Sequence, residues 1–487
     1  MTIASKNAYD VVVVGTGASG MAAAVTAAQN GLSVLLLEKG KTTGGSSNYT
    51  EGMFGVDSYL QKEAGVKIDK NEIVQSELTY FNYRADAGIW KSYVDGSADT
   101  ISWMRDLGVH FLRVQKMGTG VQSWHIYEGF GDNVIHGTFI PKAIEYGVEI
   151  LTLTAGKELH KDGDKITGIT IEDCASKETQ KIDTKVVILA TGGFLDNLEM
   201  IKEKTHYDTD RLLPVTCGKD TGDGLRMAWT IGAQEYGSGM AMLFGGYLND
   251  PEEPNYKMMH SQMCVGAGQQ PLLWVNERGQ RFVNEAVIYN FSEAGNALYT
   301  QDKVYSILDK GVIDYMAENG NFMGLGVYIN RGAKMDKLQE EIDQALKDHK
   351  PFVTKADSIE ELAQKIGLSV TTLTETIANY NRFAANGVDE DYNKSKEYLY
   401  PVSKGPFYAF ELGVGAFCTM GGLKISIDNE VLRENGQKIK GLYAVGNDSS
   451  GLVGDTYGPD KPGSCVGYAF YSGRHAAQHA KQYIASE

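Results

Sequence analysis

Hydrophobic residues along this chain follow two distinct patterns. Val11–Val14 is a continuous β-branched run, which predicts a short strand buried on both faces. In the segments 334–350 and 358–383, Leu, Ile and Ala recur at helical spacing among charged residues, which predicts amphipathic helices that each bury one face. Ser358, followed in the next turn by Glu361, predicts a capping box where the second segment begins.

A glycine-rich turn follows the first buried strand and predicts a dinucleotide site. Gly15, Gly17 and Gly20 form a GxGxxG motif, and the small residues of Met21–Asn30 favour a helix directly after it. Gly15 permits the tight turn, Gly17 lets a pyrophosphate approach the backbone, and Gly20 lets the helix pack close to the sheet. The N-terminus of this helix offers free N–H groups and the positive end of its dipole to the phosphates.

The next strand strengthens this interpretation, because an acidic residue stands at its end. Val34–Leu37 predicts the strand, and Glu38 is placed to take the ribose hydroxyls. A second polar, glycine-rich loop follows at 44–52, which a nicotinamide rarely needs. A flavin does need such a loop, because it is long and its ring system lies across the ends of the strands. We therefore predict FAD as the cofactor.

Composition and charge exclude several classes of protein. The chain has 487 residues, enough for two or three domains, and a formal net charge of −16 with a pI near 5.1. This acidity excludes the basic surface of a nucleic-acid-binding protein, and an acidic membrane surface would repel the chain. No signal peptide and no bilayer-spanning apolar run is recognised, so we expect a cytoplasmic protein without a membrane partner.

The cysteines are scattered and form no recognised motif. Without CxxC or cluster spacing they argue against haem attachment, an iron–sulfur centre and a disulfide framework, so we predict no metal and a reduced protein. The positions are Cys174, Cys217, Cys264, Cys418 and Cys465.

Further blocks along the chain occur in an order typical of one family. They read "VVILATGGF", "TGDGLRMAWTIGA", "RFVNEA", "TMGGLKI", "GLYAVGNDS" and "GSCVGYAFYSGRHAA". With these blocks the chain resembles, over nearly its whole length, the flavoprotein family of soluble fumarate reductases and 3-ketosteroid dehydrogenases. The resemblance implies an α/β fold in which a Rossmann-type FAD-binding domain, at 1–240 and 412–487, carries an inserted α+β capping domain at 241–411.

The glycine turns, the polar loop and the matching family blocks together predict the residues that bind FAD. The segment 44–52 contains no histidine where covalent members attach the ring, so we expect noncovalent FAD. The predicted cofactor-binding residues are Gly15, Gly17, Ser19, Gly20, Glu38, Lys39, Gly45, Ser46, Ser47, Thr50, Gly52, Gly156, Thr191, Gly192, Asp223, Gly446, Asn447, Ser464 and Cys465.

The positions that clamp a dicarboxylate in fumarate reductases are changed in this chain. Tyr289 and Lys461 stand where those enzymes have their two substrate arginines, and Tyr457 replaces the histidine of the second block. A further histidine is replaced by Phe417 or Cys418. A tyrosine cannot replace a bidentate arginine–carboxylate pair, so the sequence predicts that fumarate is not the substrate.

Tyr289 instead matches a tyrosine of the ketosteroid dehydrogenases, which helps move a hydrogen beside the flavin. We expect Lys461 to lie near this phenol, lower its pKa and share proton transfer with it. Asp460 and His260 are further candidates, together with Tyr457 and Cys418. Other aromatic residues could line an apolar pocket around them, and the alternative for each is plain packing. These are Trp124, Tyr127, Tyr247, Tyr256 and Phe417.

Such a site predicts a reductase that transfers hydride to a bulky, uncharged, conjugated or phenolic substrate. The chain is similar to the tetrahydrodaidzein reductases in size and in lacking haem, which favours an isoflavonoid. The alternatives are a ketosteroid-dehydrogenase-like desaturase of a cyclic ketone and a flavin electron carrier or sensor without a substrate. No second GxGxxG is present, so electrons are expected from transiently bound NAD(P)H or from a partner redox protein.

Overall fold

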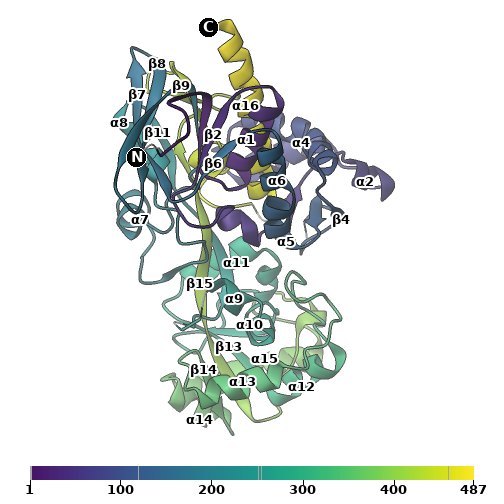
Figure 1. Cartoon of the computed structure of the whole chain (residues 1–487). Coiled ribbons are helices and arrows are strands. Elements are labelled where there is room, and N and C mark those ends of the chain that lie inside the picture. Colours follow the sequence, from purple (N-terminus) through teal and green to yellow (C-terminus); the bar gives the residue numbers. More distant parts are fainter. Residues whose placement is uncertain (1–2, 119, 251, 254, 459) are drawn as a thin grey trace.

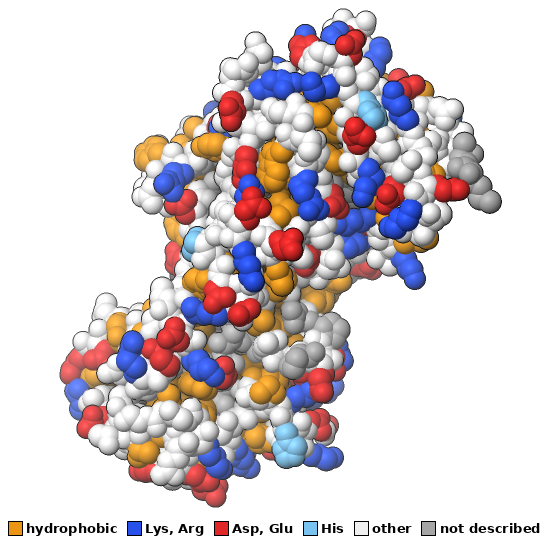
Figure 2. Space-filling model, turned by 90° about the vertical axis from the view of Figure 1, so that its left-hand side faces the viewer, with side chains coloured by type: hydrophobic (Ala, Val, Ile, Leu, Met, Phe, Trp, Pro, Cys, Tyr) orange, Lys and Arg blue, Asp and Glu red, His pale blue; other side chains and the backbone are white. Residues whose placement is uncertain are grey.

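The computed structural model describes residues 3–118, 120–250, 252–253, 255–458 and 460–487, and it has two lobes. Both chain ends lie in the upper lobe of Figure 1, and the middle of the chain forms the lower lobe. Figure 2 shows a narrower waist between the lobes, with acidic and basic side chains interspersed over both.

The upper lobe is built on an eight-stranded sheet whose centre is parallel. Strand β1 (Ala8–Val14) lies between β2 (Val34–Leu37) and β9 (Thr179–Leu189), and all three are parallel. The predicted first and second strands are therefore confirmed. Central parallel strands are buried on both faces, which explains their unbroken apolar runs. The other strands are β6 (Glu149–Leu151), β7 (Thr154–Asp162), β8 (Lys165–Asp173), β16 (Glu430–Leu432) and β17 (Lys438–Ala444).

Two helices from opposite ends of the chain pack together beside this sheet. They are α1 (Ala18–Gln29), which begins at the GxGxxG turn, and α16 (Ser464–Ser486). A Cβ on Gly473 would lie only 2.0 Å from the carbonyl oxygen of Ser19, so the two backbones approach as closely as glycine allows. The end of the chain therefore fixes the helix that begins at the GxGxxG turn.

Shorter elements complete the upper lobe. A three-stranded sheet contains β3 (Gly52–Phe54), β4 (Phe111–Gln115) and β5 (Trp124–Tyr127). The helices are α2 (Tyr59–Glu63), α3 (Lys70–Tyr80), α4 (Ala87–Leu107), α5 (Phe130–Asp132), α6 (Ile140–Glu145), α7 (Leu198–Lys204) and α8 (Asp223–Thr230). Tighter or wider helical turns are η1 (Gly45–Tyr49), η2 (Asn133–Phe139) and η5 (Gly446–Asp448).

One long strand joins the two lobes. Strand β15 (Phe407–Leu423) runs from the lower lobe into the upper one, and β11 (Glu235–Tyr247) pairs with its C-terminal half. The predicted domain boundaries, 240/241 and 411/412, fall inside these two strands, so the lobes share a continuous sheet. The same sheet contains β10 (Leu212–Pro214), β12 (Leu273–Asn276), β13 (Val304–Asp309) and β14 (Val353–Ala356).

The predicted amphipathic segments form helices of the lower lobe. The first gives α13 (Leu338–Lys347), and the second divides into α14 (Ile359–Lys365) and α15 (Val370–Asn386). Half of the predicted capping box is present, because Ser358 Oγ accepts a bond of 3.1 Å from Glu361 N, whereas the Glu361 carboxylate accepts from the backbone of Asp357. The remaining elements are α9 (Asn255–Met259), α10 (Gln262–Gly268), η3 (Glu285–Tyr289), α11 (Phe291–Tyr299), α12 (Lys310–Asn319) and η4 (Lys396–Tyr398).

Among the described residues, no helix is both long enough and apolar enough to cross a membrane.

Candidate functional site

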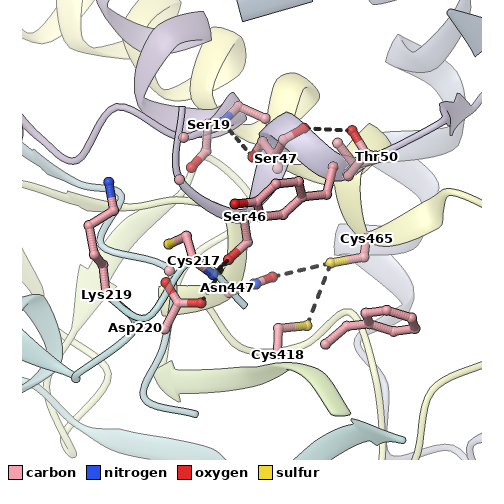
Figure 3. Close-up of a pocket in the computed structure, with 18 of the residues that line it drawn as sticks. Ser19, Ser46, Ser47, Thr50, Cys217, Lys219, Asp220, Cys418, Asn447 and Cys465 are labelled. Atoms are coloured by element: carbon pink, nitrogen blue, oxygen red, sulfur yellow. Dashed lines mark hydrogen bonds between the residues drawn. The ribbon is translucent and has the colours of Figure 1, made fainter. Parts of the chain in front are cut away.

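A large cavity begins at the C-terminal ends of the parallel strands and continues between the lobes. Its upper wall comes from the ends of β1, β2 and β9, from η1 and from the start of α16. Its lower wall comes from β11, β15, α11 and the segment 325–328. Figure 3 shows polar groups from several of these elements converging on the space.

The three motif glycines have different neighbours at the upper end of the cavity. Gly15 has φ +109°, and a Cβ there would lie 2.1 Å from the carbonyl oxygen of Ala190. A Cβ on Gly20 would lie 1.8 Å from the carbonyl oxygen of Gly15, so this glycine serves helix packing. A Cβ on Gly17 meets nothing closer than Ser47 Oγ at 3.5 Å, so the absent side chain leaves space for a ligand. This is the place where a dinucleotide pyrophosphate meets the helix N-terminus.

Charged groups gather at the end of β2. Glu38 is buried and accepts bonds from Gly40 N at 2.7 Å and from Lys219 Nζ at 3.1 Å. Lys39 Nζ forms an ion pair of 2.7 Å with Asp223 Oδ2 at the start of α8. Burial alone would raise the pKa of Asp223, but its bonds to Lys39, Arg226 and Thr221 together outweigh burial and hold that pKa below its usual value. This polar end suits the ribose and phosphate groups of a nucleotide.

The loop after β2 supplies hydroxyl groups to the middle of the cavity. Ser47 Oγ accepts a bond of 2.9 Å from the backbone N–H of Ala18, and Ser46 Oγ donates one of 3.1 Å to Asp220 Oδ2. Burial, followed by the nearby charge of Asp196, raises the pKa of Asp220 to about 8. Asp220 is therefore a neutral acid at pH 7 that faces the cofactor space, and the sequence prediction had missed it.

Most of the predicted cofactor-binding residues line this cavity. They are Gly15, Gly17, Ser19, Glu38, Lys39, Gly45, Ser46, Ser47, Thr50, Gly52, Gly156, Thr191, Gly192, Asp223, Asn447 and Cys465. Gly20, Gly446 and Ser464 stand behind the wall. Ser464 Oγ bonds the Tyr457 hydroxyl at 2.8 Å, and the N–H of Gly446 bonds Ser472 Oγ at 3.0 Å. These three residues position the wall rather than form it.

The lower wall is almost entirely apolar and aromatic. It is formed by Met117, Trp124, Met242, Phe244, Tyr256, Phe291, Leu325, Val327, Tyr328, Phe417, Cys418 and Tyr457. Among the described residues that line the cavity, none is an arginine, and the two lysines, Lys39 and Lys219, belong to the nucleotide end. The lower wall therefore suits a flat, uncharged ring and offers no clamp for a carboxylate.

Comparison with known proteins identifies the cofactor. Residues 10–458 match the model of the FAD binding domain family. The chain belongs to this family. Together with the space at Gly17 and the polar end of the cavity, this establishes FAD as the cofactor of an oxidoreductase, which agrees with the prediction from the sequence.

Two curated proteins are similar over the whole chain. A vinyl phenol reductase of Lactiplantibacillus plantarum is 60% identical over 484 residues, which cover 99% of this chain and 98% of that protein. An NADH:fumarate oxidoreductase of Klebsiella pneumoniae is 27% identical over 98% of this chain but only 48% of its own length. This chain therefore spans about half of that second relative.

Solved structures show the same fold at low sequence identity. The open conformation of a flavocytochrome c3 fumarate reductase has a TM-score of 0.74 and 23% identity, covering 98% of this chain and 79% of that one. A 3-ketosteroid Δ1-dehydrogenase of Sterolibacterium denitrificans has a TM-score of 0.80 and 20% identity, covering 99% and 100%. The predicted family resemblance and fold class are thus confirmed.

Two thiols meet where the FAD cavity joins the aromatic wall. Cys418 Sγ lies 4.0 Å from Cys465 Sγ, and Cys465 Sγ lies 3.3 Å from Asn447 Oδ1 (Figure 3). The neighbouring Cys465 thiol and burial raise the pKa of Cys418 well above its ordinary value. Cys418 is therefore a neutral thiol in the wall, which does not favour it as a base.

Tyr289 does not line the described cavity wall, which corrects the role expected for it. Its side chain is 5% exposed, and its hydroxyl donates a bond of 2.5 Å to the carbonyl oxygen of Met323. The Tyr398 ring and the Arg331 guanidinium lie beside the phenol. Burial raises the pKa of Tyr289, opposite to the expected lowering. In this arrangement Tyr289 supports the segment that leads to the wall residue Leu325.

Lys461 is not brought to Tyr289 either. It is buried, and its Nζ forms an ion pair of 2.9 Å with Glu77 Oε1 on α3. Asp460 contributes its backbone carbonyl to a bond of 3.1 Å from the N–H of Val121, and its charge acts on Glu77. In place of the predicted proton-transfer pair, Lys461 therefore forms a buried ion pair with Glu77.

The other two predicted catalytic residues differ in their position. Tyr457 lines the cavity, and burial raises its pKa above the ordinary value. His260 stands one layer behind, with ring centroids 4.6 Å from Tyr256 and 4.5 Å from Tyr328, and burial lowers its pKa. His260 therefore supports two wall tyrosines and does not itself line the cavity.

Glu51 is a wall residue that the sequence prediction missed. It follows the serine-rich loop and lies at the junction between the FAD space and the aromatic wall. Burial raises the pKa of Glu51 to about 7, and its charge helps to raise the pKa of Tyr256 and of Tyr328. A carboxyl group that titrates near neutrality, next to phenol groups in a cleft, is a candidate for proton transfer.

Proposed function

We propose that this FAD enzyme reduces the conjugated C=C bond of an uncharged phenolic substrate of the vinyl phenol class. The observation that carries the proposal is the arginine-free aromatic wall that directly adjoins the FAD space. The vinyl phenol reductase at 60% identity supports the same substrate class. An isoflavonoid such as tetrahydrodaidzein remains a larger phenolic candidate for the same wall.

A dicarboxylate is a poor ligand for this cavity. Each buried carboxylate without a cationic partner costs several kcal/mol relative to water. The two lysines that reach the cavity are already paired, Lys39 with Asp223 and Lys219 with Glu38. Fumarate would therefore lie against Phe417, without a guanidinium to pair its charge.

Glu51 is the residue that we assign to the phenolic hydroxyl. Near pH 7 about half of a carboxyl group with this pKa is ionised, so it can accept the phenol proton. Loss of that proton to Glu51 pushes electrons through the ring to the terminal vinyl carbon, which takes up a proton from water and leaves a quinone methide. FAD supplies, when bound and reduced, the hydride that the benzylic carbon then accepts. The product phenolate regains its proton, so the net change is one hydride and one proton added across C=C.

Wall tyrosines complete the proposed recognition of the substrate. Tyr256 and Tyr328 have phenol groups that stay protonated at neutral pH, because burial raises the pKa of each. They can donate hydrogen bonds to the substrate oxygen as it becomes a phenolate, which stabilises the developing charge. Electrons for FAD come, in this proposal, from transiently bound NAD(P)H or from a partner redox protein.

The test is a set of single-turnover reactions under anaerobic conditions. The flavin of the purified protein is reduced chemically, and vinyl phenol, a larger isoflavonoid, a 3-ketosteroid or fumarate is added in turn. We expect vinyl phenol to restore the oxidised flavin spectrum and to yield the ethyl phenol, with fumarate inert. Reoxidation by fumarate at a comparable rate, or no reoxidation by either phenolic compound, would contradict the proposal. Reoxidation by the steroid alone would instead support the cyclic-ketone alternative.

A further inference from the structure

Two histidines and two carboxylates lie together on the upper lobe, and none of them lines the FAD cavity. His475 and His479 are one helical turn apart on α16, so their rings project from the same face. Asp428, ahead of β16, faces both rings. Its Oδ1 lies 3.4 Å from Nε2 of His475, and its Oδ2 lies 3.9 Å from Nε2 of His479. Single ligand atoms of Asp428, Glu430 and His479 lie within 4.8 Å of one another, and His475 joins this set through Asp428.

The imidazole nitrogens that face Asp428 are oriented for metal binding. Nδ1 of His479 is held by the Tyr443 hydroxyl at 2.9 Å, which leaves Nε2 directed at the carboxylate. An outer partner on the other ring nitrogen is the usual arrangement around a metal-binding histidine. Nε2 of His475 is a buried atom without a hydrogen-bond partner among the described residues. Asp428 is therefore the carboxylate that both Nε2 atoms face.

We propose that His475, His479 and Asp428 form a binding site for a divalent transition-metal ion, with Zn²⁺ as the best match. Imidazole nitrogen and carboxylate oxygen are ordinary zinc ligands, at about 2.0–2.2 Å in tetrahedral geometry. Bonds of that length place neighbouring ligand atoms roughly 3.3–3.5 Å apart. The 3.4 Å between His475 Nε2 and Asp428 Oδ1 already matches this distance between ligand atoms. The 3.9 Å between His479 Nε2 and Asp428 Oδ2 is longer, by an amount that a small side-chain movement would remove.

The fourth ligand is Glu430 or a water molecule. Glu430 is the weakest of the protein candidates, because Lys438 Nζ contacts its Oε2 and Ser426 Oγ donates to the same oxygen at 3.2 Å. The side chains of Asp428, His475 and His479 are each 24–34% exposed, which gives an ion a path from solvent and leaves room for water. Zinc with three protein ligands and one water is an established arrangement.

The proposed ion would tie the last helix to the sheet. Asp428 belongs to the turn that enters β16, whereas both histidines belong to α16, which packs against α1. A metal bound only by the folded chain stabilises it, so the melting temperature should rise with free Zn²⁺. The sequence prediction of no metal considered cysteine spacing, and it did not consider His-x-x-x-His on one helix face. This inference is independent of the proposed reaction.

The test measures Zn²⁺ binding by the FAD-loaded protein. After EDTA treatment and buffer exchange, Zn²⁺ is titrated against a chromophoric chelator, and bound metal is counted by elemental analysis. We expect one Zn²⁺ per chain and a melting temperature at least about 2 °C higher with excess Zn²⁺. In H475Q and H479Q separately, we expect affinity to fall at least about tenfold. The double variant should lose both the ion and the thermal shift.

A matched control is His136→Gln, which removes another histidine that faces an aspartate one turn away, Asp132 at 2.9 Å. It lacks a second histidine, so we expect Zn²⁺ binding to remain as in the parent protein. FAD absorbance and circular dichroism show whether each variant is folded. If a folded double variant retains the ion, the metal is elsewhere, for example at Cys418 and Cys465, and the proposal is wrong. It is equally wrong if the parent binds no Zn²⁺, because His475 and His479 then form only ion pairs with Asp428.

Discussion

The two walls of the FAD cavity differ in whether their carboxyl groups have cationic partners. At the nucleotide end, Glu38 pairs with Lys219, and Asp223 pairs with Lys39, so each of these carboxylates has a lysine partner. The aromatic wall between the lobes has no arginine among its described residues, and Glu51 is its one carboxyl. Neutralised charge favours a permanently bound anionic cofactor, whereas an uncompensated carboxyl favours a group that takes up and releases protons.

This difference assigns cofactor binding to one end of the cavity and proton transfer to the other. Opposite charges near Asp223 keep the pKa of that carboxyl low, so Asp223 stays ionised across neutral pH. Burial without a cation brings the pKa of Glu51 to about 7, so its charge changes under physiological conditions. Asp223 is therefore expected to keep its charge between pH 6 and pH 8, whereas Glu51 is not.

The largest effect is expected from closing the phosphate space with Gly17→Val. A Cβ at this position has room within the protein, so the chain should fold, but the side chain occupies the place of the pyrophosphate. We expect FAD affinity to fall at least about 100-fold, or about 2.8 kcal/mol, with loss of all turnover. Flavin absorbance after gel filtration measures it. The control is Gly239→Val, an exposed glycine whose Cβ would also be unhindered, and it should retain FAD.

The next largest effect is expected at the other wall, from Glu51→Gln. The amide keeps the shape of the side chain but cannot accept the phenol proton, so turnover of vinyl phenol should fall by roughly 10²–10⁴. In the parent, turnover should be lost as pH falls through about 7, because the base becomes protonated. That acidic limb should vanish in the variant, whereas Glu128→Gln, on the exposed surface nearby, should keep it. An unchanged pH profile in Glu51→Gln would remove Glu51 from the reaction.

The residues at the nucleotide end of the cavity could be predicted from the sequence, because they lie close together along the chain. Gly15 and Gly17 belong to one glycine-rich turn, and Glu38 follows the adjacent strand. A short segment of sequence is therefore enough to recognise all three residues. The fold followed from the same cause, since β1 and β2 are recognisable from unbroken apolar runs. The predicted domain boundaries fall within β11 and β15, because these paired strands belong to a sheet that the two lobes share.

The substrate wall was harder to predict because its chemistry depends on residues far apart in the sequence. Glu51 becomes a weak acid only because distant segments bury it, and no pattern around it signals this. Tyr289 and Lys461 were placed by resemblance, yet each has a nearer partner, Met323 and Glu77 respectively. Alignment can indicate which residue occupies a position, whereas hydrogen bonding decides what its polar group is free to do.

A pH-dependent effect, on stability rather than on turnover, is expected from Asp220→Asn. The folded pKa of this carboxyl is about 8, well above its ordinary value of 3.8, so the folded state holds a proton that the unfolded chain releases. Its contribution to stability is complete below about pH 4 and is lost as pH rises through 8. The variant has no such loss, so it should exceed the parent by several kcal/mol at pH 9 and by little at pH 4. Urea unfolding of flavin-stripped protein across this pH range measures the difference.

Asp223→Asn is the opposite case and serves as the control for this experiment. The folded pKa of Asp223 is lowered, so its contribution is present above about pH 4 and is lost as pH falls through the folded pKa. Its removal should therefore destabilise the protein at neutral pH. If both variants shift stability in the same direction at pH 8, the contrast between paired and unpaired carboxyls is wrong.

The smallest effect is expected from Tyr289→Phe, which separates support of the wall from chemistry at the wall. The substitution keeps the ring against Tyr398 and removes only the hydroxyl that donates to the Met323 carbonyl. Loss of this bond should cost about 1 kcal/mol of unfolding free energy, because one buried hydrogen bond is removed. Turnover of vinyl phenol should stay within about threefold of the parent, since a proton donor would contribute at least about 100-fold. Steady-state kinetics and thermal melting on the same preparation measure both quantities. A 100-fold fall in turnover with unchanged FAD binding would instead show that this phenol leaves Met323 and enters the cavity during the reaction, as the ketosteroid dehydrogenase resemblance suggested.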